Sequence, residues 1–274
     1  MKSQLEELTY VEFRERLKDD PVILVPLGSQ EEQGASAPMG DFMLAKELAR
    51  RVAEKTGAIA APTVPFGYAD YFRPVPGGVQ LSADTFKGLL RDVLDAFLAH
   101  GLTKLLIFNG HTGNSPLIDQ VVRTVKRETG VVVPWINIWR VLPESVWRQA
   151  HGENAPRARG HGADPVSSAY LHLLPGLYRR DLAAAADSGG ELIGLRTANL
   201  QGLAFEGLEV NAPVDITDHS RNGIVSGDAR LATAEAGRLF SDYIVERAAA
   251  LVSHLQTVRQ SAPPPARDGR DGGA

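Results

Sequence analysis

Three acidic side chains lie close together in one short stretch of the chain and could do chemistry as a group. Glu31, Glu32 and Asp41 fall within residues 26–42, PLGSQEEQGASAPMGDF, directly after an apolar run. The chain has no Cys, so any metal ion that it binds must take nitrogen and oxygen ligands. Carboxylates together with a histidine are a ligand set that suits Zn²⁺, Mn²⁺ or Fe²⁺. A histidine brought to these acids by the fold would therefore complete a metal site.

His111 is the histidine best placed to join them. It lies in a glycine-rich loop, FNGHTGNS, which also follows an apolar run, KLLIF. If the two apolar runs are neighbouring parallel strands, both loops emerge at the edge of the sheet where ligands bind in open α/β folds. Glu31, Asp41 and His111 would then converge, and the glycines beside His111 would allow close approach of the backbone.

A third loop, residues 160–168 with the sequence GHGADPVSS, contains two further candidates just before a helical pattern. His161 could handle a proton, and Asp164 could add a carboxylate to the site. Each also fits a purely structural role, because His161 lies in a Gly-rich turn and Asp164 is a suitable helix N-cap. Both interpretations stay open on residue type alone.

The residues of the first two loops have structural alternatives as well. Asp41 precedes FMLAKELARR and could simply cap that helix. Glu31 and Glu32 could belong to a solvated loop. His111 follows an Asn-Gly dipeptide, which is typical of a turn.

Strand-like and helix-like segments alternate along the chain and would position these loops. Apolar runs rich in β-branched residues predict buried strands at 22–26, 58–64, 104–109 and 131–137. Helical patterns occupy 43–55, 84–100, 115–127, 165–174 and 230–256, and Ser82 or Asp84 is the N-cap of the second. This alternation predicts βαβ units and a mostly parallel sheet covered on both faces.

Length, charge and composition exclude several classes of protein. The 274 residues contain no internal linker, so we expect one domain at 1–260, followed by a disordered tail at 261–274 with the sequence SAPPPARDGRDGGA. A formal charge of −4 with both signs interspersed gives no basic surface for nucleic acid or membranes. The N-terminus lacks an apolar core, no later run could span a membrane, and Cys is absent, which favours a cytoplasmic protein with a small-molecule partner.

The order of the loops resembles the creatininase (creatinine amidohydrolase) family. Its first block reads roughly Gly-Ser-x-Glu-Gln-His-Gly-Pro-His-x-Pro and then an Asp, and this chain has GSQEEQGASAP and then Asp41. Its second block, Asn-Gly-His-Gly-Gly-Asn, is matched by NGHTGN, and its third, His-Ala-Gly-Glu-x-x-Thr-Ser, by HGADPVSS. Segments 65–82 and 222–237 are similar too, so the resemblance covers roughly residues 5–255.

This resemblance implies a three-layer α/β/α fold, often assembled as a hexamer, in which divalent metals activate water to attack a C–N bond of a small, commonly cyclic, amide. Carried over by position, Glu31, Asp41 and His111 match metal ligands. His161 matches a histidine proposed for substrate or proton handling, and Asp164 stands where the family has Glu. The resemblance therefore makes Glu31, His161 and Asp164 the expected catalytic residues.

The chain departs from the family pattern at the metal-binding residues. Gln33 replaces the first-block histidine that binds metal, Ser36 replaces the next one, and Asp41 comes one residue early. Some relatives have a second-block Glu where this chain has Gly113. We therefore expect one tightly bound divalent metal (Zn, Mn or Fe) at Glu31, Asp41 and His111, and a second, looser site made from Gln33, Asp164 and water.

Three functions are compatible with these features. The first is a metal-dependent amidohydrolase acting on a non-peptide amide or lactam. The second is a biosynthetic enzyme that forms or rearranges a C–N bond on the same scaffold, and the third is a non-catalytic binding or assembly protein. We also expect a homo-oligomer whose active site is partly walled by a neighbouring subunit, because segments 65–82 and 135–147 carry aromatic residues such as Tyr71 and Trp139. The alternative is that these aromatic residues pack on the core of their own chain.

Overall fold

A four-stranded parallel sheet forms the centre of the molecule, which is a computed structural model that describes residues 2–260. Its strand order is β2-β1-β3-β4. The bounds are β1 (Ile23–Leu27), β2 (Ile59–Ala60), β3 (Leu105–Asn109) and β4 (Trp135–Asn137). All four strands lie where the sequence predicts them, although β2 and β4 are shorter than expected. The two central strands pair from Ile23 with Leu105 to Leu27 with Asn109, so they end side by side.

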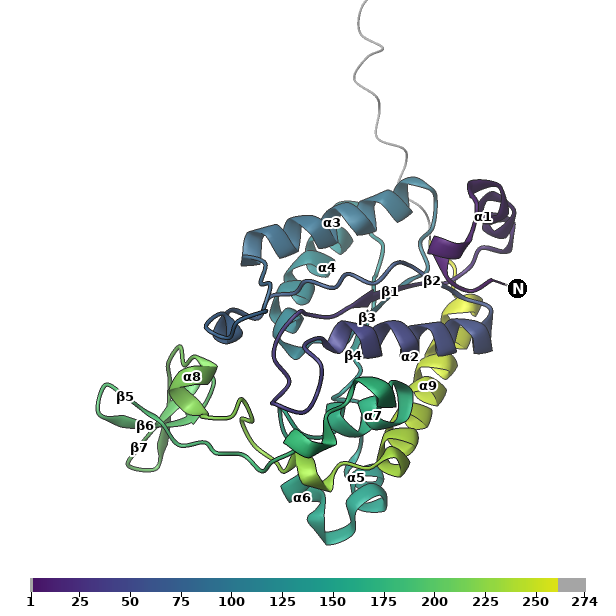
Figure 1. Ribbon diagram of the computed structural model, residues 1–274. Helices are drawn as coiled ribbons and strands as arrows, with labels where there is room; N and C mark the ends of the chain where they lie inside the picture. Colours follow the sequence, from purple (N-terminus) through teal and green to yellow (C-terminus); the bar gives the residue numbers. More distant parts are fainter. Residues whose placement is uncertain (1, 261–274) are drawn as a thin grey trace, which may run out of the picture.

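Helices cover both faces of this sheet, which confirms the predicted three-layer α/β/α fold (Figure 1). One face carries α3 (Ala83–Ala99) and α4 (Ser115–Thr129). The other face carries α2 (Asp41–Thr56), α5 (Glu144–His151) and α9 (Ala234–Thr257). The remaining helices are α1 (Tyr10–Arg16), α6 (Ala155–Ala158), α7 (Val166–Leu173) and α8 (Ile216–His219).

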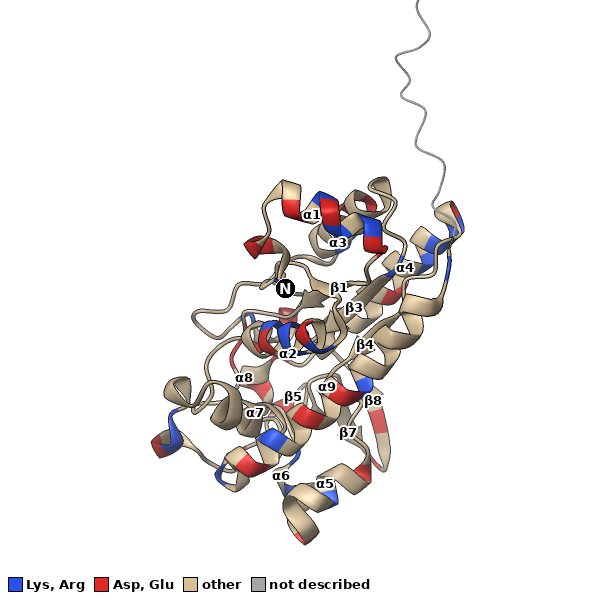
Figure 2. Ribbon diagram, turned by 90° about the vertical axis from the view of Figure 1, so that its right-hand side faces the viewer, with Lys and Arg blue, Asp and Glu red and all other residues tan. Residues whose placement is uncertain are grey.

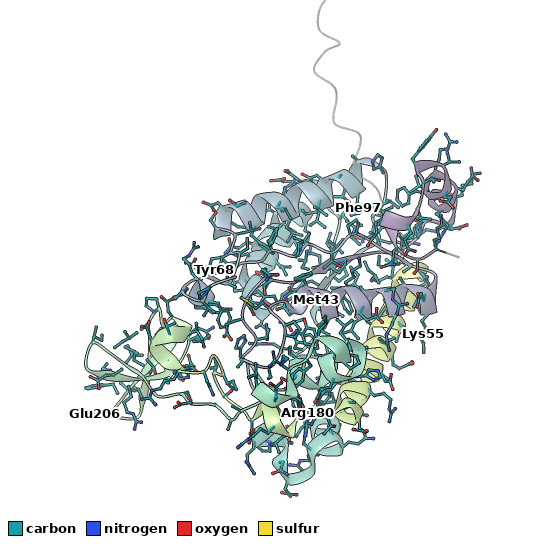
Figure 3. The ribbon with its side chains drawn as sticks, in the orientation of Figure 1. Met43, Lys55, Tyr68, Phe97, Arg180 and Glu206 are labelled. Atoms are coloured by element: carbon teal, nitrogen blue, oxygen red, sulfur yellow. The ribbon has the colours of Figure 1, made fainter. Side chains whose placement is uncertain are left out.

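Side chains of the central strands alternate between the two helical layers and are buried on both sides. Leu24 and Leu106 pack against the layer of α2 and α9, whereas Val25 and Ile107 pack against α3 and α4. Each of the four is at most 1% exposed. Burial on both faces explains why these strands have continuous apolar sequences. Figure 3 shows side chains filling the space between the layers.

A second sheet, which the sequence analysis did not predict, projects from the three-layer body (Figure 1). Its antiparallel strands are β5 (Glu191–Leu192), β6 (Leu195–Asn199), β7 (Gly202–Phe205) and β8 (Leu208–Asn211). Glu206 lies at its outer edge in Figure 3, far from the central sheet. All four residues of β8 are exposed, so the burial pattern on which strand prediction depends is absent here.

The N-termini of α3 and α2 show which of the candidate residues act as helix caps. Ser82 is the N-cap of α3, because its side chain accepts a hydrogen bond from the Thr85 N–H. Helix α2 begins at Asp41 itself with Gly40 at the N-cap position, so the interpretation of Asp41 as the cap is wrong. Both acidic and basic residues, coloured red and blue on the ribbon of Figure 2, occur along α2 and α9.

The tail expected at 261–274 lies outside the described residues. Among residues 2–260, every helix is too short or too polar to cross a lipid bilayer.

Candidate active site

Glu31, Asp41 and His111 meet at the carboxyl end of the central sheet. Glu31 lies in the loop after β1, Asp41 is the first residue of α2, and His111 follows β3. The Gly110 N–H donates to the Leu27 carbonyl across 2.7 Å, which holds the two loops together. One possible ligand atom from each of the three side chains lies within 4.8 Å of the other two, and no residue of the three is more than 3% exposed. The structure thus brings together the three residues expected to bind metal.

Hydrogen bonds fix the orientation of these side chains. The backbone N–H of Ser29 donates to Asp41 Oδ1 (2.6 Å), and the Ser29 hydroxyl donates to Asp41 Oδ2 (3.1 Å). His111 Nε2 is 3.0 Å from the Tyr68 carbonyl, and its Nδ1 is 3.1 Å from both Asp41 Oδ2 and Glu31 Oε1. Because a carbonyl can only accept, Nε2 carries a proton and Nδ1 is the nitrogen that faces the acids.

Burial and charge together shift the pKa values of this group. The pKa of Asp41 is raised to about 6: burial and the charge of Glu31 raise it, while His111 and the hydrogen bond from the Ser29 N–H oppose the shift. For His111, burial alone would lower the pKa, but the charge of Glu31 and the hydrogen bonds to Asp41 and Glu31 raise it well above its ordinary value. Two buried carboxylates therefore need positive charge beside them, which a metal cation or a proton on His111 can supply.

The three residues fit a divalent metal ion. Glu31 Oε2 is buried and has no hydrogen-bond partner among the described residues, so a ligand atom is left free. It lies beside a second carboxylate and the Nδ1 of an imidazole whose other nitrogen is fixed by a backbone carbonyl. That arrangement is typical of histidines that bind metals, because the second hydrogen bond sets the tautomer and the ring orientation.

The space for a second metal ion, near Gln33 and Gly113, is limited by neighbouring side chains. Gln33 Nε2 donates to Glu31 Oε1 (3.0 Å), so its amide points toward the first site. A Cβ at Gly113 would lie 2.4 Å from His111 Nε2 and 2.5 Å from the Tyr71 hydroxyl oxygen. Position 113 therefore cannot carry an acidic side chain unless its neighbours move.

Asp164 lies apart from the metal group. Its carboxylate is 2.6 Å from His151 Nε2, and it accepts hydrogen bonds from the Ser168 N–H (2.8 Å) and hydroxyl (2.6 Å). Both carboxylate oxygens are thus in use, and the residue is only 1% exposed. The structure shows Asp164 connecting α5 to the first turn of α7, which does not support the expected role of Asp164 as a ligand of a second metal.

His161 lines the same cavity as the metal group and is paired with Glu32. His161 Nε2 is 2.9 Å from Glu32 Oε1, and the imidazole stacks on the Phe72 ring at a centroid distance of 4.3 Å. Burial lowers the pKa of His161, but the hydrogen bond and charge of Glu32 outweigh this effect and raise it. Glu32 is only 6% exposed, so its interpretation as a solvated loop residue is wrong. The sequence analysis did not identify Glu32 as the partner of His161. The available signal was that Glu32 stands where the resembled family has Gln.

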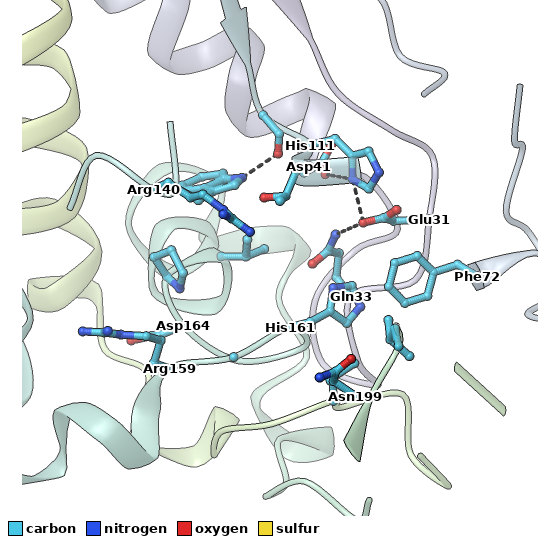
Figure 4. Close-up of a pocket in the computed structure, with 18 of the residues that line it drawn as sticks. Glu31, Gln33, Asp41, Phe72, His111, Arg140, Arg159, His161, Asp164 and Asn199 are labelled. Carbon is cyan, nitrogen blue, oxygen red and sulfur yellow. Dashed lines mark hydrogen bonds and ion pairs between the residues drawn. The ribbon is translucent and has the colours of Figure 1, made fainter. Parts of the chain in front are cut away.

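A cavity of about 630 Å³ connects these residues (Figure 4). In Figure 4, Asp41, His111 and Glu31 lie at one end, and Asp164 and Arg159 lie at the other. Trp139 and Trp147 contribute aromatic wall, and the Trp139 Nε1–H donates to the Gly110 carbonyl (2.6 Å). Residues 199–201, at the β6–β7 turn, also line the cavity. The unpredicted sheet therefore supplies part of the site.

Comparison with known proteins decides the family. A family model described as Creatininase, creatinine amidohydrolase, matches residues 6–252. The chain belongs to the creatininase family. Characterised relatives are named as hydrolases or peptidases, and the enzymatic interpretation of the sequence is confirmed at that level.

Individual relatives differ in the substrates that their names give. A 3-dehydro-scyllo-inosose hydrolase of Thermotoga maritima is 27% identical over 240 residues, which cover 84% of this chain and 76% of that protein. A creatinine amidohydrolase of Pseudomonas putida is 31% identical over 129 residues, which cover 44% of this chain and half of that enzyme. A mycofactocin precursor peptide peptidase of Mycobacterium ulcerans is 25% identical over 82% of each chain.

Solved creatininase structures share the fold. The manganese form of a creatininase superimposes with a TM-score of 0.76 at 24% identity, covering 94% of this chain and 100% of that one. A zinc form of a creatininase mutant gives the same values. At this level of identity, the match supports the three-layer fold alone.

The first prediction concerns metal content. We expect purified protein to bind about one divalent transition metal per chain, because the buried acids lack a fixed positive charge. His111→Ala should lower the affinity for Zn²⁺ by at least about a hundredfold, measured by competition with a chromophoric chelator. His254→Ala, which removes an exposed histidine of α9, is the matched control and should bind as the parent does. Protein that stays metal-free after incubation with Zn²⁺ and Mn²⁺ would contradict the assignment.

The second prediction concerns Gln33. Gln33→His should raise the metal stoichiometry from about one toward two, because imidazole is a stronger ligand than a carboxamide. Elemental analysis after dialysis against excess Zn²⁺ gives the number. Unchanged stoichiometry would mean that the space around Gly113 and Tyr71 has closed the second site.

Proposed function

We propose that this protein is a metal-dependent amidohydrolase that cleaves a non-peptide C–N bond of a small amide, with cyclic amides as the first class to test. The observation that carries the proposal is the buried group of Glu31, Asp41 and His111, which has a free carboxylate oxygen and lines a cavity of about 630 Å³. We assign one tightly held Zn²⁺, Mn²⁺ or Fe²⁺ per chain. The carboxylate and imidazole donors suit each of these ions, and Mn and Zn are the metals named for two solved creatininase forms.

The residues of the site divide the work between holding the metal and moving protons. When bound, the ion would supply Lewis-acid activation of water and of the amide carbonyl. Glu31, Asp41 and His111 would hold it, with the His111 ring kept in place by the Tyr68 carbonyl. His161, with its raised pKa, keeps a proton that it can donate to the leaving nitrogen, and Glu32 orients it. Phe72 stacks on the His161 ring, and Trp139 and Trp147 add apolar surface to the cavity wall.

Formation of a C–N bond, the main alternative from the sequence, would use the same groups in the opposite direction. The relatives favour hydrolysis, since each is named as a hydrolase, an amidohydrolase or a peptidase. Their substrates differ so much that none can be assigned to this chain by similarity.

The third prediction tests the activity. Metal-loaded protein should hydrolyse a member of a panel of lactams, cyclic ureides and open-chain amides, and chelation should abolish the activity until metal is returned. His161→Ala should lower kcat by roughly 10²–10⁴ through loss of proton transfer, without changing the metal stoichiometry. Ninhydrin or mass-spectrometric detection of the released amine measures the rate. Equal rates for metal-free and metal-loaded protein would contradict the proposal.

We further propose that the chain forms a homo-oligomer through the projecting sheet. Phe205 pairs with Leu208 and Leu203 with Val210, which places Phe205, Leu208 and Val210 on one face of this sheet. These three residues are 45%, 65% and 40% exposed, so they form an apolar patch that a single chain leaves exposed, although Leu203 on the same face is buried. Closed symmetric assembly is the usual way to bury such a surface. A hexamer and a neighbour that walls the active site remain predictions from the family resemblance.

The fourth prediction tests this assembly. Light scattering should give a mass that is a multiple of 29.5 kDa at micromolar concentration. The double variant Phe205→Lys with Leu208→Lys should shift the mass toward one chain, because charge on that face opposes its burial. Glu206→Lys places a lysine at the same tip by reversing an existing charge, without removing apolar surface, and should leave the assembly intact. A parent protein with the mass of one chain would refute the assembly.

A further inference from the structure

A second cavity of about 740 Å³ lies directly beside the first. Its wall shares five residues with the wall of the first cavity, namely Tyr71, Thr112, Arg140, Leu200 and Gln201. The space that begins at the metal group therefore continues past Tyr71 toward the second sheet. A small cyclic amide bound at the metal group would leave this second space empty.

Arg140 is placed at the junction of the two cavities. It lies exposed just after β4, and its guanidinium makes no hydrogen bond or ion pair with any residue in the described part of the chain. Arg159, the other arginine of the first cavity, already interacts with residues of its own chain. Its Nη2 is 2.8 Å from Glu144 Oε2, and its guanidinium lies 4.4 Å from the Trp147 ring centroid. In Figure 4, both arginines lie across the cavity from Glu31 and Phe72. The charge of Arg140 is thus available to a ligand.

The other charged groups of the second cavity are two carboxylates. Asp70 accepts a hydrogen bond from Arg73 Nε (2.8 Å), and Asp215 is the N-cap residue of α8, where its backbone N–H donates to Asp218 Oδ2 (3.0 Å). Arg140 is the only Lys or Arg among the described residues that line this cavity. One free arginine beside two carboxylates suits a singly charged anion better than a dianion, because the acids repel additional negative charge.

We propose that Arg140 binds a carboxylate of the substrate, so that the substrate is an amide which extends from the metal group into the second cavity and carries a carboxylate there. This inference rests on the proposed function and adds a substrate class to it. A planar guanidinium can donate two parallel hydrogen bonds to a carboxylate, which gives both affinity and orientation. Thr112 and Gln201, which line both cavities, provide neutral polar groups along the path.

Hydroxamates that bind metal can test the subsite without knowledge of the substrate. The probes are acetohydroxamate, a series of ω-carboxy hydroxamates of increasing chain length, and the same series with a terminal carboxamide. With Zn²⁺-loaded protein, the carboxylate of the best length should bind about tenfold more tightly than its carboxamide, measured by calorimetry. Arg140→Ala should remove this difference, and Arg140→Lys should restore part of it. Arg123→Ala, which removes an exposed arginine of α4 outside both cavities, should keep the full difference.

The outcomes separate this inference from the proposed function. Acetohydroxamate is too short to include a carboxylate and reports the metal centre alone in every variant. If it binds but carboxylate and carboxamide bind equally at all lengths, or if the difference survives Arg140→Ala, the subsite is refuted and the metal centre stands. If acetohydroxamate fails to bind Zn²⁺-loaded protein, the proposed function is refuted and the substrate class falls with it.

Discussion

The site depends on the burial of two carboxylates beside one imidazole. Removing Glu31 and Asp41 from water costs roughly several kcal/mol for each ionised group unless positive charge or hydrogen bonds compensate. Ser29 supplies hydrogen bonds to Asp41, but Glu31 keeps a buried oxygen without a partner among the described residues. His111 can balance only part of this negative charge. A divalent cation balances it fully. Metal binding should therefore stabilise the conformation of the loops that carry these residues.

The parallel sheet creates this site because its two central strands end at the same level. Leu27 and Asn109 are register partners, and the loops that follow them carry Glu31 and His111. The helix after the first loop begins at Asp41, so its first residue faces the same point. The second sheet then extends the site away from the metal group, since its β6–β7 turn lines both cavities. The layered fold thus positions the three candidate metal ligands, and the projecting sheet forms part of the walls of both cavities.

The sequence predicted the layered fold and the metal group because both depend on local, strongly patterned features. Continuous apolar runs marked the strands, and Gly-rich loops after two of them marked Glu31, Asp41 and His111. The projecting sheet was not predicted, because Leu208 and Val210 are exposed and give no burial pattern. The partners of Glu32 and Asp164 could not be predicted for a different reason. Glu32 pairs with His161, 129 residues away along the chain, and Asp164 pairs with His151, 13 residues away, and no local sequence pattern marks either pair.

The most direct test of this account is anomalous diffraction from crystals soaked in Zn²⁺, because it locates the ion without reference to activity. The account predicts a strong peak coordinated by carboxylate oxygens of Glu31 and Asp41 and by Nδ1 of His111, with the His111 Nε2–H still donated to the Tyr68 carbonyl. A crystal that shows no peak between these three residues, or that binds Zn²⁺ only elsewhere, would contradict it.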